Sequence, residues 1–258
     1  MNRLTTPLIT AVLMTIGTPL LATEMASSGS VDDLHINNII THDPSPHNAI
    51  IDLAWDSQYI SQGRNNLNEG GIYWATAAWQ QQDITLYSTV GRADSMAYIE
   101  WNLGLEYALP LGDRFDGSLG YQRIQVYGDE ECADNELFAS LSYTHIGWLT
   151  PSIAYTYSTA AAGYFVEASL HSEWALSPQL TITPYVTQGF DVQYVTEAHN
   201  GRNHLQLGVE IQYQLSPQLT LSSHISHTLA QQDIKHQVGP HSGNLDHTFA
   251  GLHLNWSL

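Results

Sequence analysis

The sequence is poor in charge, and in positive charge above all. Only 12% of its 258 residues are charged, whereas soluble proteins usually have about 25%. Lysine and arginine together number 7 against 25 aspartates and glutamates, which gives a net charge of −18. A nucleic-acid-binding protein needs a basic surface to neutralise phosphates, so no nucleic-acid partner is expected. The same deficit excludes a polybasic membrane-surface anchor.

Long apolar runs and cysteine pairs are also missing. A transmembrane helix needs about 20 consecutive apolar residues, and no such run follows residue 22. Cys132 is the only cysteine, so an intrachain disulfide is excluded. The class that remains is a β protein whose apolar residues are spread singly over many strands, which includes sandwiches and membrane barrels.

The first residues have the pattern of a secretory signal peptide. Arg3 precedes a largely apolar stretch that ends in a small residue at Ala22, as signal peptides require. The next segment is polar, rich in serine and proline, and without a hydrophobic period. We therefore expect three parts: 1–22 as a signal peptide, 23–47 as a flexible periplasmic N-terminal segment, and 48–258 as a transmembrane β-barrel.

From Ala49 onward apolar and polar residues alternate, as expected for strands with two unlike faces. Such stretches run about ten residues, close to the nine to eleven of a tilted membrane strand. In the fifth, Leu119 and Tyr121 have one parity but Ile124 and Val126 the other, which suggests a bulge. The sequence predicts twelve strands, which begin near residues 49, 70, 83, 96, 114, 135, 150, 163, 179, 203, 218 and 246.

Short and longer connections alternate strictly between these strands. Five short turns and six longer loops fit an up-and-down barrel with both chain ends on the periplasmic side. The last strand alternates to an apolar terminal residue, Leu258, and so resembles the C-terminal signal of bacterial outer-membrane barrels. The predicted fold is all-β, a transmembrane up-and-down antiparallel β-barrel of about 12 strands, surrounded by outer-membrane lipid.

One segment resembles a known family. Ser57-Gln58-Tyr59-Ile60-Ser61-Gln62-Gly63-Arg64-Asn65-Asn66-Leu67, followed by Glu69-Gly70-Gly71, is similar to the first hairpin of the TorF-type porins of proteobacterial outer membranes. In that family a Ser-x-Tyr-x-x-x-Gly stretch closes the first strand and a glycine-rich entry opens the second. The match covers about fifteen residues. It implies an outer-membrane barrel and carries over no catalytic or binding residue.

Carboxylates dominate the polar face of the predicted strands. Their field favours cations over anions in a narrow tube with low-dielectric walls. The one plausible strand arginine, Arg123, lies where the suspected bulge leaves its side undecided. The predicted pore-lining residues are Asp52, Asp56, Glu100, Glu106, Glu167, Glu173 and Glu210.

Two clusters carry possible chemistry. Ser223-His224-Ile225-Ser226-His227 contains a His-x-Ser pair of the kind used by outer-membrane lipid hydrolases. Its parity places His224 and Ser226 inside the barrel, away from lipid, so no enzyme activity is expected. Glu210, His224 and His253 lie at similar heights on the last three predicted strands, and a carboxylate with two imidazoles suits a divalent transition metal. The alternative is that these residues simply line a wet lumen.

The sequence thus predicts a passive, cation-preferring channel for small solutes in the bacterial outer membrane, with no cofactor. Two alternatives remain: a lipid-ester hydrolase that uses the His-x-Ser pair, and a structural or surface-interaction barrel with no open pore. The oligomeric state is left open.

Overall fold

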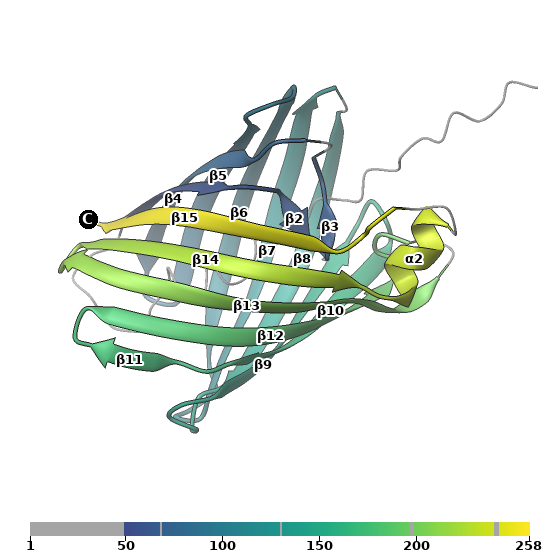
Figure 1. Ribbon diagram of the computed structural model, residues 1–258. Coiled ribbons are helices and arrows are strands. Elements are labelled where there is room, and N and C mark those ends of the chain that lie inside the picture. Colours follow the sequence, from purple (N-terminus) through teal and green to yellow (C-terminus); the bar gives the residue numbers. More distant parts are fainter. Residues whose placement is uncertain (1–48, 68, 130, 197–198, 240–242) are drawn as a thin grey trace, which may run out of the picture.

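The computed structural model describes residues 49–67, 69–129, 131–196, 199–239 and 243–258. The expected signal peptide and N-terminal segment lie outside these residues. The described chain forms a closed antiparallel barrel of twelve strands (Figure 1). Among the described residues, no helix has both the length and the apolar character needed to cross a membrane.

Each predicted strand is present and begins within three residues of its expected start. A short strand, β11 (Trp174–Ser177), continues β10 after a break and pairs with β12. The twelve barrel strands are β1 (Ala49–Asp56), β4 (Ile72–Gln81), β5 (Ile84–Ala93), β6 (Tyr98–Pro110), β7 (Phe115–Gly128), β8 (Cys132–Tyr143), β9 (Thr150–Ser158), β10 (Gly163–His171), β12 (Leu180–Val192), β13 (Asn200–Ser216), β14 (Leu219–Ala230) and β15 (His247–Ser257).

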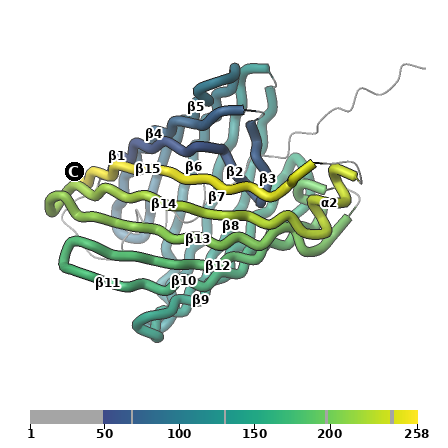
Figure 2. Tube along the Cα trace, in the orientation of Figure 1, coloured from purple at the N-terminus to yellow at the C-terminus, as the bar shows by residue number. Residues whose placement is uncertain are grey.

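The barrel closes where its first strand meets its last. Strands that follow one another in the chain pair as neighbours, and β1 pairs with β15 from Ile50↔Ser257 to Asp56↔Gly251. Figure 2 shows this seam, with the two strands side by side near the C-terminus. Short turns lie at the end with the C-terminus, and α2 (Gln232–Val238) stands at the opposite end, among the longer loops.

The outer surface is apolar and has aromatic residues near both ends. Leucines such as Leu53, Leu103 and Leu207 are exposed in mid-strand, as expected for side chains that face lipid. Aromatic side chains near the strand ends match the girdles of outer-membrane barrels. They are Trp79, Tyr107, Phe115, Trp174, Tyr213 and Trp256 at the end with short turns, and Trp55, Tyr73, Tyr127 and Tyr164 at the other. The protein is therefore an outer-membrane barrel.

The suspected bulge in the fifth barrel strand is wrong. β7 pairs with β6 and β8 without a register shift. The apolar residues change sides instead: Leu119 and Tyr121 face lipid, whereas Ile124 and Val126 point inward and are fully buried. Arg123 consequently points outward, where its guanidinium donates to Asn135.

Ile124 and Val126 point inward because the first loop folds into the barrel. A small hairpin of β2 (Ile60–Ser61) and β3 (Arg64–Asn65) follows β1. Tyr59 and Leu67 flank this hairpin and pack with the inward side chains of β4 to β7 in one buried cluster. We call residues 57–67 and 69–71 the plug loop. It fills part of the lumen at the α2 end.

Aromatic rings cover glycines on the inner face of the sheet. Each ring lies across from the glycine that pairs with it on the next strand, as Tyr87 does with Gly104. A Cβ at Gly104 would lie 2.1 Å from the Tyr87 ring, so only glycine leaves room for it. The other pairs are Trp74 with Gly91, Phe138 with Gly120, and Tyr185 with Gly208. These rings narrow the lumen and stiffen its wall.

Candidate functional site

A polar cavity of about 230 Å³ remains inside the barrel beside the plug loop. Ile60, Gln62 and Gly63 of the plug loop close one side of it. Its wall comes from the inner faces of β8, β9, β10, β12 and β13, and it extends toward the end with short turns. Its acidic lining residues are Glu167, Glu173 and Glu210.

The seven predicted pore-lining carboxylates fall into three groups. Glu167, Glu173 and Glu210 line the cavity, with Glu173 exposed in the break between β10 and β11. Asp52 and Asp56 are buried near two histidines at the seam where β1 pairs with β15. Glu100 and Glu106 are buried on the inner face of β6.

Glu100 belongs to the plug rather than to an open surface. Its carboxylate accepts hydrogen bonds from the Tyr59 hydroxyl at 3.0 Å, from Tyr98, and from the Asn102 amide at 2.8 Å. A buried carboxylate requires such donors to offset the loss of water. The hydroxyl of Tyr59 therefore anchors the plug loop to β6.

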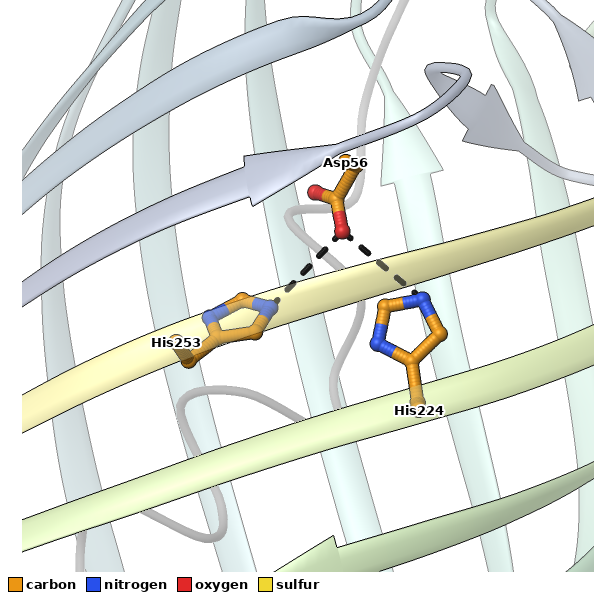
Figure 3. Close-up of side chains that lie close together, drawn as sticks. All are labelled: Asp56, His224 and His253. Atoms are coloured by element: carbon orange, nitrogen blue, oxygen red, sulfur yellow. Dashed lines mark ion pairs between the residues drawn. The ribbon is translucent and has the colours of Figure 1, made fainter.

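Asp56, His224 and His253 converge on one point of the inner wall (Figure 3). Asp56 Oδ1 lies 3.7 Å from His224 Nε2 and 3.7 Å from His253 Nε2. One ligand atom from each of the three residues lies within 4.8 Å of the others. The residues come from β1, β14 and β15, so the group spans the barrel seam.

The two predicted histidines therefore lie together, but the carboxylate grouped with them is Asp56 instead of Glu210. Glu210 is the direct cross-strand neighbour of His224 on β13, and it lines the cavity. The carboxylate that approaches both histidines is Asp56, because closure places β1 against β15. Sequence spacing along the last three strands could not reveal this contribution from the first.

The His-x-Ser pair also lies inside the barrel. Ser226 is buried, and its hydroxyl shares a hydrogen bond of 2.7 Å with the Tyr185 hydroxyl. Gln206 donates to the same Tyr185 oxygen at 2.8 Å. The serine hydroxyl thus belongs to a network on the inner wall, whereas a membrane lipid lies on the other side of the sheet.

A second polar network joins the plug loop to two other loops at the α2 end. Arg64 donates to Asp233 of α2 at 3.3 Å and to Thr196, after β12, at 3.1 Å. Asp233 is fully buried and also accepts from Thr196, Asn203 and His199. Burial lowers the pKa of Arg64, while the nearby Asp191 and Asp233 raise it. We call Arg64, Thr196 and Asp233 the loop clasp.

Sequence reasoning missed the loop clasp because its members lie far apart in the chain. Asp191 reinforces it, since its carboxylate accepts from the backbone N–H groups of residues 194, 195 and 196 and so shapes the loop after β12. In the described part of the chain, Arg64 is the only lysine or arginine inside the barrel. Arg123 is half-buried on the lipid side, and the remaining ones are exposed.

Comparisons with solved structures show a likeness of fold to other outer-membrane barrels. No family model and no curated protein matches the sequence, so the TorF-type resemblance stays a prediction. A structure described as KdgM porin in complex with disordered oligogalacturonate superposes with a TM-score of 0.57 at 10% identity, over 81% of this chain and 99% of that one. The NanC porin gives a TM-score of 0.51 at 13% identity, over 81% and 100%. At such identities the likeness shows the fold alone.

Proposed function

We propose that the barrel is a passive, cation-preferring channel for small solutes in the outer membrane, of the TorF type that its first hairpin resembles. The observation that carries the proposal is the sign of the charges around the cavity. Three carboxylates line it, and Arg64, the only described lysine or arginine inside the barrel, is held by the loop clasp. A field of this sign attracts cations and repels anions where low-dielectric walls limit screening.

The chemistry of the lining also bears on the class of solute. The KdgM structure was determined with an oligogalacturonate, which is a polyanion. Glu167, Glu173 and Glu210 would repel such a chain. Small cations and neutral polar solutes fit a cavity of about 230 Å³ with this lining.

The plug loop and the loop clasp define where the path is narrow. The plug loop occupies the lumen on the β4 to β7 side, whereas the cavity lies along β8 to β13. Solutes would therefore pass along the carboxylate-lined wall. The loop clasp controls the width of the α2 end, because it ties the plug loop to the loops beside α2.

Reversal potentials in planar bilayers test this proposal. In a KCl gradient we expect the wild type to prefer K⁺ over Cl⁻. The double variant Glu167→Gln and Glu210→Gln removes two lining charges at nearly constant volume, and the preference should fall toward equal permeability. Asp83→Asn, in an exposed turn after β4, is the matched control and should keep the wild-type value. A wild type that prefers Cl⁻, or shows no discrete conductance, contradicts the proposal.

The same experiment addresses the barrel without an open pore, since that alternative predicts no channels for any variant. The hydrolase alternative predicts that purified protein cleaves lipid esters and that Ser226→Ala abolishes the cleavage. We expect no cleavage by the wild type, because the Ser226 hydroxyl points into the lumen and bonds to Tyr185.

A further inference from the structure

Three side chains at the barrel seam have the composition and spacing of a transition-metal site. We propose that Asp56, His224 and His253 bind one divalent transition-metal ion such as Zn²⁺, with the remaining coordination positions directed into the lumen. Two imidazoles and a carboxylate form a donor set that zinc and its neighbours in the periodic table favour. Ca²⁺ and Mg²⁺ prefer sets made of oxygen alone.

The distances suit such an ion. Tetrahedral coordination with bonds of about 2.1 Å places ligand atoms roughly 3.4 Å apart. Asp56 Oδ1 already lies 3.7 Å from the Nε2 atoms of both His224 and His253. These two pairs need a contraction of a few tenths of an ångström, and the two histidine nitrogens, which lie within 4.8 Å of each other, need at most about 1.4 Å. Side-chain rotation can supply both movements.

In Asp56 and His253, the polar atom that faces away from the proposed ion has a hydrogen-bond partner, as is usual for metal ligands. Trp74 Nε1 donates to Asp56 Oδ2 at 3.1 Å, which leaves Oδ1 directed at the histidines. His253 Nδ1 lies 3.3 Å from Asp52 Oδ1. With its proton on Nδ1, His253 donates to Asp52 and presents the Nε2 lone pair. A carboxylate behind a ligating histidine fixes the ring and its tautomer in many metal sites.

Gly251 makes the space between the ligands. It pairs directly with Asp56 on one side and with His224 on the other. A Cβ at this position would lie 2.0 Å from Asp56 Oδ1 and 2.3 Å from the His224 ring. The two side chains therefore lean over the glycine toward each other, and His253 lies two residues further along β15.

The proposed metal site lies where the barrel closes. β1 and β15 meet there to close the barrel, so one ion would join the first strand to the last two. Binding to the folded barrel alone stabilises it by mass action. The cavity approaches the site through Glu210, the cross-strand neighbour of His224. This inference does not depend on whether the barrel conducts.

Zinc titration of the refolded full-length barrel in detergent, without a histidine tag, tests the proposal. Calorimetry should show one saturable Zn²⁺ site per chain, and Co²⁺ should give the absorption of a low-symmetry site. Asp56→Asn, His224→Ala and His253→Ala should each weaken binding at least a hundredfold, and Asp52→Asn, which removes only the support of His253, about tenfold. His227→Ala is the matched control, since His227 is an exposed histidine on the same strand.

Thermal unfolding gives a second, independent measurement. Zn²⁺ should raise the melting temperature of the wild type and of His227→Ala but not that of Asp56→Asn, while Mg²⁺ should leave all three unchanged. Migration of the folded barrel on unheated gels shows that each variant is folded. The proposal is overturned if the wild type has no saturable site, or if Asp56→Asn binds Zn²⁺ like the wild type. It is also overturned if binding requires Glu210 rather than Asp56.

Discussion

Tyr59 is the side chain through which the plug loop is best tested. Its ring packs edge-on against Trp74, with centroids 5.1 Å apart, and lies 6.1 Å from the Tyr98 ring. Its hydroxyl donates to the carboxylate of Glu100. The side chain is 4% exposed, so Tyr59→Ala removes both the packing and the hydrogen bond that hold the plug loop against the wall.

The size of the effect follows from these contacts. Replacing a buried large aromatic residue with alanine costs about 3–5 kcal/mol, and a hydrogen bond to a charged group contributes about 1.5–3 kcal/mol. The two losses overlap, so we take about 3 kcal/mol as the destabilisation of the docked plug loop. That value shifts the equilibrium between docked and undocked plug loop by about a hundredfold. Tyr59→Phe keeps the ring and loses only the hydrogen bond to Glu100. That loss of about 1.5 kcal/mol shifts the equilibrium between docked and undocked plug loop roughly tenfold.

Single-channel recording in planar bilayers measures this shift. Tyr59→Ala should show larger or longer-lived conductance levels than the wild type, and Tyr59→Phe should fall between them. Tyr73→Ala is the matched control, because it removes a tyrosine that is 56% exposed on the lipid side of β4. If folded Tyr59→Ala conducts like the wild type, the plug loop does not limit the pore and the reasoning is refuted.

Two further predictions concern the loop clasp and the barrel wall. Arg64→Ala leaves the buried Asp233 without its cationic partner, and such a loss costs about 3–5 kcal/mol. We therefore expect more frequent channel openings in bilayer recordings. Lys235→Ala is the control, since Lys235 is an exposed residue of α2, the helix of Asp233, and this variant should behave as the wild type. Gly104→Val forces side-chain atoms into the Tyr87 ring and should lower the melting temperature of the barrel, by gel shift or circular dichroism, while Gly147→Val, with nothing within 4 Å, should leave it unchanged.

Alternation predicted the barrel well because each strand has one face in lipid and one in a wet lumen. The period of two is a local property, and it sets both the strand starts and the outward side chains. The reasoning failed at Ile124 and Val126, where apolar residues occupy the inward parity. They do so because Tyr59 and Leu67 fold in from the first loop to cover them. Apolar residues in the first loop and apolar residues at inward positions of β7, considered together, would have predicted a loop that packs inside the barrel.

The groups inside the barrel were harder to predict, because they depend on which strands and loops meet. Tyr59 and Glu100 are 41 residues apart, and Arg64 and Asp233 are 169 apart. Asp56 approaches His253 only because the barrel closes. Parity alone placed Asp56 and both histidines on the inner face, but it gave no register between β1 and β15.

The inward carboxylates therefore fall into three groups, which differ in the side chains around them. At the α2 end, tyrosine hydroxyls donate to Glu100 and Glu136, and Arg64 pairs with Asp233, so these charges hold the loops in place. At the seam, Asp52 and Asp56 face histidines. Glu167, Glu173 and Glu210 are the carboxylates that line the cavity, with Glu167 Oε1 3.8 Å from His204 Nε2. Ion selectivity should consequently respond to Glu167 and Glu210, whereas removal of Glu100 or Asp233 should change how often the path is open rather than which ion it prefers.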